Sequence, residues 1–129
     1  MHVCMSPKPH VFTTLDKTAR IGAIYLVRTQ ITDAGVVHLK GLNSLQSLNL
    51  WDTQITNAGL VHLKGLTSLQ TLYLDETQVT DAGLVHLSGL TSLQTLHLNN
   101  TQITDAGVAK LQKALPNCNI SREIAAAHP

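Results

Sequence analysis

The sequence predicts an α/β solenoid with right-handed turns, a parallel concave sheet of about four to five strands, and short convex helices. The first observation behind this prediction is a pattern that recurs every 24 residues, anchored by one threonine in each copy. The second is composition: 43% of the 129 residues are hydrophobic and 21 are leucine, but only 3% are aromatic. The third is a charged fraction of 13%, where about 25% is usual. Repeated leucine positions in the core and uncharged polar turns account for all three.

Alternation predicts the strand of each repeat. Leu48 and Leu50 flank Asn49, so both leucines face one side while Asn49 and Trp51 face the other. This pattern indicates a short strand with one buried face. Copies of the pattern begin near residues 21, 45, 69 and 93. The crossover from each parallel strand to the next is expected to be right-handed.

A short helix is predicted after each strand. Thr56 and Asn57 are residue types that cap helix N-termini, because their side-chain oxygens accept the free N–H groups of the first turn. Leu60 and Leu63 then recur at helical spacing. A glycine after each of the first three helices is expected to end it in the left-handed conformation. These glycines are Gly41, Gly65 and Gly89.

The period and skeleton of the repeat match the leucine-rich repeat signature, whose period is about 20–29 residues. A threonine stands where that signature usually has asparagine or cysteine, at Thr29, Thr53, Thr77 and Thr101. Asparagine at this position forms a ladder to the neighbouring backbone, and a threonine hydroxyl can donate one such bond. We therefore expect this column to be structural and not a set of nucleophiles.

The turn sequence carries a family resemblance. Residues 101–108 read Thr-Gln-Ile-Thr-Asp-Ala-Gly-Val, which resembles bacterial leucine-rich repeat proteins of the ribonuclease-inhibitor-like group. The segment is also similar to the cysteine-containing repeats of F-box substrate receptors, and residues 114–120 resemble the closing partial repeat of the bacterial proteins. The resemblance covers about residues 21–122 and implies an interaction scaffold. No F-box-like segment is present, so a ubiquitin-ligase role is not implied.

The ends of the array are expected to be capped, because a solenoid exposes core leucines there. Residues 1–20 are predicted to be a lead-in and a degenerate cap, with a helix over 11–17 that turns Phe12 and Leu15 toward the first repeat. Residues 21–122 hold about four repeats and a terminal partial repeat, and residues 123–129 form a tail. Residues 119–122 are expected to add an edge strand, with Arg122 in place of a buried leucine.

Charge and cysteine placement exclude several classes of partner and location. A net charge of +1 argues against nucleic acid and anionic membranes, and no apolar stretch approaches the roughly 18 residues of a membrane span. The N-terminus does not read as a secretory signal. Cys4 and Cys118 belong to opposite ends of the stack, roughly 15–20 Å apart, whereas a disulfide needs Cα atoms within about 7 Å. Two free thiols and a cytoplasmic location are therefore expected.

The sequence predicts no enzyme, metal site or cofactor. His38, His62 and His86 form one column on the convex helices, whose axes should lie about 8–10 Å apart. Side chains at that separation do not converge well on one ion, because Zn–N distances are about 2.0–2.1 Å. No HExxH, CxxC, GxGxxG, Walker-type or GxSxG motif occurs.

The outward strand positions are the predicted binding site, because they vary while the turns repeat almost unchanged. Three of the four aromatic residues fall there, and tyrosine and tryptophan are favoured anchors of recognition surfaces. The alternative is that aromatic residues simply suit strands. We call this surface the concave strand face, and its candidate binding residues are Tyr25, Asn49, Trp51, Asp52, Tyr73, Asp75, Glu76, His97 and Asn99.

The size of this face limits its partner. Four strands offer roughly a dozen contacts, fewer than the roughly 20–30 residues that each side of a standard interface uses. The leading interpretation is a non-enzymatic module that binds a protein or peptide, and the acidic residues favour a basic segment. One alternative is a structural, self-assembling piece of a longer array that associates through its N-terminal end. Glycan binding is a further alternative.

Overall fold

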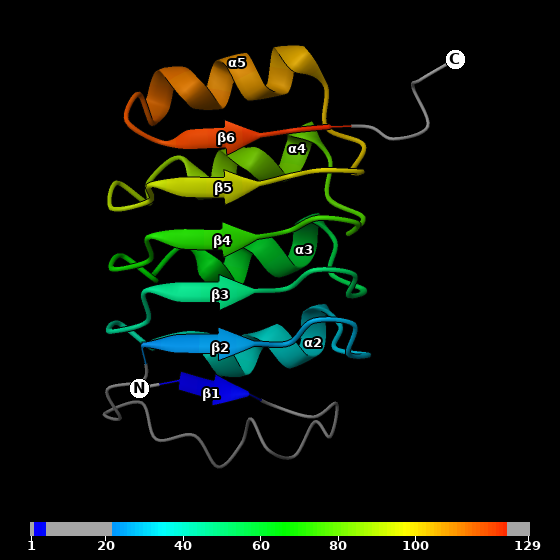
Figure 1. The fold of residues 1–129 in the computed structure, drawn as a ribbon, viewed down its shortest axis with the longest axis vertical. Helices are drawn as coiled ribbons and strands as arrows, with labels where there is room; N and C mark the ends of the chain where they lie inside the picture. Colours follow the sequence, from blue (N-terminus) through cyan, green and yellow to red (C-terminus); the bar gives the residue numbers. More distant parts are fainter. Residues whose placement is uncertain (1, 5–21, 124–129) are drawn as a thin grey trace.

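The computed structural model describes residues 2–4 and 22–123 of the chain, with side chains over 22–123. It is a stack of parallel strands in one six-stranded sheet, ordered β1 to β6 along the chain, with helices covering one face (Figure 1). The strands are β1 (His2–Cys4), β2 (Ala23–Tyr25), β3 (Ser47–Asn49), β4 (Thr71–Tyr73), β5 (Thr95–His97) and β6 (Asn119–Ser121). The helical segments are α2 (Asp33–Val36), η1 (Val37–Leu39), α3 (Asn57–Leu60), η2 (Val61–Leu63), α4 (Asp81–Leu84), η3 (Val85–Leu87) and α5 (Asp105–Ala114).

The strand register repeats with the period of the sequence. Leu48 lies opposite Leu72, which lies opposite Leu96, so paired residues are 24 positions apart. This arrangement confirms the predicted solenoid. The sheet also contains β1, which pairs with β2 inside the segment that was expected to be a lead-in. Its three residues follow no alternating pattern, so periodicity does not predict this strand. The predicted cap helix over 11–17 and the end of the tail lie outside the described residues.

The core is a continuous column of aliphatic side chains between the sheet and the helices. In one repeat, Leu48 and Leu50 of the strand segment and Leu60 and Leu63 of the helical segment have no exposed surface. The helical segment combines four α-helical residues with three residues of 3-10 helix, and each part contributes one buried leucine. Since no repeat encloses its own leucines, each repeat relies on its neighbours for burial.

The helix ends differ from the sequence-based expectation at two glycines. Gly41 has a φ of 92° and ends its helix in the predicted left-handed conformation, but Gly65 and Gly89 do not adopt positive φ. The prediction was wrong for these two because the preceding residues, Lys64 and Ser88, stay in the right-handed helical region. The chain then turns away without a left-handed residue.

The threonine column is structural, but its bonds are local. The hydroxyl of Thr53 donates to the carbonyl of Leu50, three residues earlier in the same repeat, at 2.8 Å. The same bond recurs at Thr29, Thr77 and Thr101. The predicted ladder to the neighbouring repeat was therefore wrong at this position. The threonine side chain is short, so its hydroxyl reaches only a carbonyl of its own repeat, just after the strand.

The side-chain ladder between repeats runs through the residue that begins each helix. Asn57 accepts the backbone N–H of Thr80 at 2.8 Å and donates its amide to the Thr80 hydroxyl at 2.7 Å. Asp33 binds Thr56 through the same two groups, and Asp81 binds Thr104 likewise. The prediction that these Asp and Asn side chains cap the helices is wrong, because they bind the neighbouring repeat. The threonines are the helix N-caps, as predicted, and Thr56 and Thr104 accept a capping N–H.

The acidic residue that begins the last helix, α5, binds an arginine and not a threonine. Asp105 occupies the ladder position after Asp81, and its partner is the guanidinium of Arg122, which forms an ion pair with it. The same guanidinium donates to the carbonyl of Ile103 at 3.0 Å. Arg122 follows β6 and stands opposite a buried leucine of the preceding repeat, which confirms the expected edge strand and its polar end.

The two cysteines lie at opposite edges of the sheet. Cys118 precedes β6 and is a free, buried thiol, as predicted. Cys4 is in β1 at the other edge, and its side chain lies outside the described residues. None of the helices among the described residues has the length and apolar character that crossing a membrane requires.

Candidate functional site

The concave strand face is the surface of the sheet that the helices leave open (Figure 1). Strand pairing places its central row as predicted, with Tyr25 beside Asn49, Asn49 beside Tyr73, and Tyr73 beside His97. All four side chains are partly exposed. The tyrosine ring of Tyr73 stacks on His97, with ring centroids 4.4 Å apart and planes inclined by 15°. This pair gives the face a flat, fixed surface over β4 and β5.

A second row of candidates lies beyond the carboxyl ends of the strands. Because β3 ends at Asn49, Trp51 belongs to the turn that follows, where its backbone N–H donates to Asn49 Oδ1 at 3.0 Å. The side chain of Trp51 is partly exposed. The side chain of one candidate residue, Asn49, therefore positions the backbone of another, Trp51.

The residue after this row adopts the left-handed conformation in every repeat. Arg28, Asp52, Glu76 and Asn100 have φ between 54° and 58°. This conformation directs the Asp52 N–H to the carbonyl of Asp75 in the next repeat at 2.9 Å, so inter-repeat bonding continues past the strands. Asparagine and aspartate tolerate positive φ better than other non-glycine residues, and arginine and glutamate are less suited to it.

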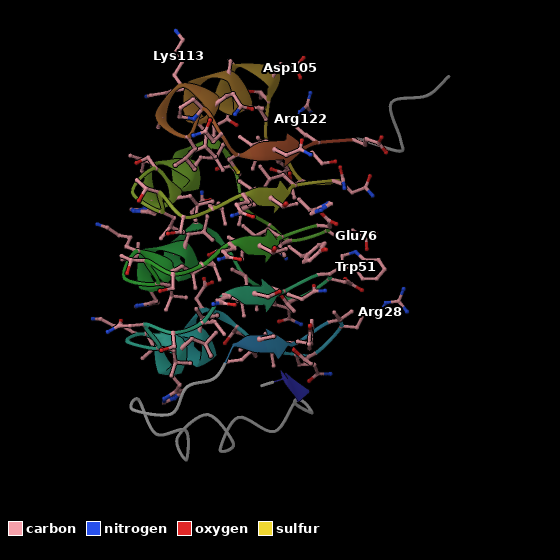
Figure 2. The ribbon with its side chains drawn as sticks, turned by 60° about the vertical axis from the view of Figure 1, so that its left-hand side comes forward. Arg28, Trp51, Glu76, Asp105, Lys113 and Arg122 are labelled. Carbon is pink, nitrogen blue, oxygen red and sulfur yellow. The ribbon has the colours of Figure 1, made fainter. Side chains whose placement is uncertain are left out.

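Arg28 joins the candidate site, although sequence reasoning did not select it. Its guanidinium carbon lies over the Trp51 ring, 5.0 Å from the centroid, and its Nε is 3.9 Å from Asp52 Oδ2. Figure 2 shows Arg28, Trp51 and Glu76 at the same edge of the sheet, with Trp51 between the other two. The signal that could have found this contact was the opposite charges of Arg28 and Asp52, one repeat apart in the same column.

Two candidates also hold the backbone of the next repeat. Asp75 Oδ1 accepts the N–H of Asn99 at 2.9 Å, and Asn99 Oδ1 accepts the N–H of Glu123 at 2.8 Å. Ser121 also donates its hydroxyl to Asn99. These side chains position the turns, so part of their hydrogen-bonding capacity is used within the chain.

The acidic candidates differ in their partners. Within residues 22–123, the ion pairs are Arg28 with Asp52 and Arg122 with Asp105. Neither pair involves Asp75 or Glu76, and Glu76 is exposed. We call the second row and the left-handed residues after it, taken together, the strand-end row. This row carries one arginine, Arg28, and three carboxylates, Asp52, Asp75 and Glu76, so its net charge is negative.

The opposite surface has its own features. His38, His62 and His86 lie on η1, η2 and η3, and the described residues contain no cluster of three or more metal-binding side chains. A groove of about 440 Å³ lies between α4 and α5 and is lined mainly by apolar side chains such as Leu84, Val85 and Leu111. It contains none of the binding residues that the sequence predicted.

A comparison with known protein families agrees with the repeated strand and helix pattern described above. A family model described as "Leucine Rich repeats (2 copies)" matches residues 43–84 and 67–117. The chain belongs to the leucine-rich repeat family. A search of curated proteins finds no match.

Two solved structures among those that match this leucine-rich repeat chain are internalins from Listeria monocytogenes. Internalin C2 is 38% identical with a TM-score of 0.67, and the match covers 81% of this chain and 44% of that one. A second internalin is 21% identical with a TM-score of 0.57, covering 97% of this chain and 39% of that one, and it supports the fold alone. The chain thus spans less than half of either structure. These matches support the resemblance to bacterial leucine-rich repeat proteins, while the ribonuclease-inhibitor-like subgroup and the cytoplasmic location stay predictions.

Proposed function

We propose that this leucine-rich repeat chain is a non-enzymatic module that binds a protein or peptide segment through its concave strand face. The observation that carries the proposal is the placement of aromatic rings. Within residues 22–123 the buried core is aliphatic apart from Cys118 and the threonine column, whereas Tyr25, Trp51 and Tyr73 all lie on the concave strand face. Since the core does not need these rings, their contribution is available for recognition.

The pattern of variation supports the same face. The inter-repeat ladder uses Asp, Asn and Thr at equivalent positions in successive repeats, as the same hydrogen bonds require. The central row of the concave strand face instead changes from tyrosine to asparagine, back to tyrosine and then to histidine. Positions that do not keep one residue type from repeat to repeat can diverge to fit a ligand.

Strain at the strand ends is a further support. Arg28 and Glu76 occupy left-handed positions, where glycine or asparagine would be less strained. Residues in sparsely populated backbone conformations cluster at functional sites, where the side chain serves a purpose other than stability. The charged side chains of these two residues are exposed, as a recognition role requires.

Affinity capture with the wild-type chain and a Trp51→Ala/Tyr73→Ala variant tests the proposal, together with selection from a displayed peptide library. We expect wild-type ligands to be lost from the double variant. A Val61→Ala/Val85→Ala variant is the matched control, because these side chains are apolar and exposed on the helical surface. Ligands that the concave variant retains at full affinity, or that the helical variant alone loses, contradict the proposal. If the wild-type chain captures a glycan and the concave variant does not, the ligand is a glycan and not a peptide.

The assembly alternative is tested separately. End-to-end association would join the two edges of the sheet, of which the C-terminal one is β6 (Asn119–Ser121). Sedimentation over a wide concentration range measures it directly. A monomer at every concentration removes assembly as the function, and concentration-dependent growth that Trp51→Ala/Tyr73→Ala leaves unchanged favours it.

A further inference from the structure

The contact between Arg28 and Trp51 is an example, within one chain, of how the concave strand face holds a cation. The guanidinium of Arg28 lies over the indole ring, and the carboxylate of Asp52 approaches its Nε. An aromatic face combined with a carboxylate binds arginine well, since the ring quadrupole and the negative charge both attract the planar cation. The strand-end row thus contains a guanidinium-binding arrangement that is filled by the chain's own residue.

A second carboxylate, that of Glu76, lies on the other side of Trp51 from Arg28. Arg28, Asp52 and Glu76 occupy the same position in three successive repeats, so Glu76 flanks Asp52 on the side away from Arg28. Figure 2 places Trp51 between Arg28 and Glu76. Within residues 22–123 no ion pair neutralises Glu76 or the adjacent Asp75. Trp51 is partly exposed, and this side of it carries two carboxylates without an ion pair among the described residues, whereas the carboxylate of Asp52 is paired with Arg28.

We propose that the ligand segment of this chain carries an arginine, whose guanidinium binds between the Trp51 ring and the carboxylate of Glu76. This inference rests on the proposed function and names the chemistry of its ligand. Arg28 fills the first side of Trp51 and the ligand's arginine fills the second. The positions of Arg28 and Glu76 are two strand spacings apart, about 10 Å, so both cations fit without direct contact.

Geometry favours arginine over lysine in this place. A guanidinium is flat, so it can lie on a ring and still direct N–H groups sideways to a carboxylate. An ammonium group is compact and strongly hydrated, and it loses more solvation on the same surface. Glu76 is exposed and lies next to Trp51 at the same side of the sheet (Figure 2).

The test uses a fluorescein-labelled hexapeptide of alternating glycine and arginine, with the matched citrulline, lysine and glutamate peptides. Trp51 is the only tryptophan in the chain, so its emission reports contact at this site directly. We expect the arginine peptide to change Trp51 emission in a saturable way and to bind about tenfold more tightly than the uncharged citrulline peptide. The lysine peptide should bind more weakly than the arginine peptide.

Variants locate the contact. Glu76→Gln should weaken the arginine peptide by about fivefold, because it removes the charge and keeps the shape of the side chain. Glu123→Gln makes the same change of charge two strands away, beyond the end of β6, and should leave affinity within about twofold. Arg28→Gln should raise affinity, since it removes a like charge from the same ring. Circular dichroism of each variant shows that the fold is retained.

Each contrary result has a definite meaning. Equal binding of the citrulline and arginine peptides, equal losses in Glu76→Gln and Glu123→Gln, or a loss in Arg28→Gln as large as that in Glu76→Gln overturns the inference. If the arginine peptide does not bind but library peptides still require Trp51 and Tyr73, the inference fails and the proposed function stands. If no peptide requires these rings, both fail.

Discussion

Thr104 donates its backbone N–H and its hydroxyl to the carboxylate of Asp81, which lies one repeat earlier, with the N–H at 2.9 Å. Both donors favour the ionised carboxylate, the hydroxyl most, and the nearby positive charge of Arg122 adds to the effect. The pKa of Asp81 is therefore held below its ordinary value of 3.8. Its contribution to stability is complete above that value and is lost as the pH falls through the lowered pKa.

Replacing Asp81 should separate the charge from the hydrogen bonds. Asp81→Ala should destabilise the fold by about 1–3 kcal/mol at pH 7, because it removes both acceptors from Thr104. Asp81→Asn should cost less, since Asn57 already binds Thr80 through both groups of an amide. Urea denaturation at pH 7 and at pH 3 measures these changes. The difference between the wild type and Asp81→Asn should shrink at pH 3, and a difference that does not depend on pH contradicts the account.

The glycine in the turn pattern should be intolerant of a methyl group where the ladder passes it. A Cβ on Gly83 would lie 2.3 Å from Asn57 Oδ1 and 2.8 Å from Leu60 Cδ1. Gly83→Ala should therefore cost about 1–3 kcal/mol. Gly89→Ala in the same repeat is the control, because a Cβ there meets nothing within 4 Å and the φ is not positive. Thermal unfolding should rank Gly89→Ala close to the wild type, and equal losses would show that the close approach is unimportant.

Stability and binding should conflict at Glu76. Glu76→Asn should stabilise the chain by about 0.5–1 kcal/mol, because asparagine tolerates the left-handed backbone and already occupies it at Asn100. The same variant should weaken the arginine peptide, since the carboxylate is lost. Asp52→Asn is the matched control and should change stability less. Urea midpoints and peptide titrations measure both effects, and a destabilised Glu76→Asn chain would contradict the assignment of strain.

The thiol of Cys118 should react only slowly with thiol reagents in the folded chain. Its side chain is buried, and burial raises the pKa of the thiol, so little thiolate is present or reachable near neutral pH. In a Cys4→Ser background, reaction with a disulfide reagent should speed up by about tenfold or more when urea unfolds the protein. Rapid modification of the native chain would mean that the C-terminal edge opens easily.

Much of the fold could be predicted because one pattern carries it. The alternation around Leu48 and the spacing of Leu60 and Leu63 recur in each repeat, so the strand, the buried faces and the parallel order follow from periodicity. The role of Asn57 could not be read in the same way. A helix N-cap and an inter-repeat bond call for the same residue types, and only the stacked geometry separates them.

The candidate site was predicted in part. The row that contains Tyr73 and His97 follows from strand alternation, and their pairing is confirmed. The left-handed backbone at Arg28 and Glu76 could not be predicted, because neither residue type favours it. The contact of Arg28 with Trp51 depends on that backbone, so it was missed as well.

The bond between Arg122 and Asp105 determines where a duplicated repeat can be inserted into this array. A duplicated unit inserted between two internal repeats brings its own helix-starting acid or amide and its own threonine, so it extends the stack without an unmatched group. A unit added after β6 would bury the Arg122 guanidinium among leucines, which is costly for an arginine separated from water. Copies are therefore accepted upstream of the closing edge, and each one lengthens the concave strand face by about 4.8 Å.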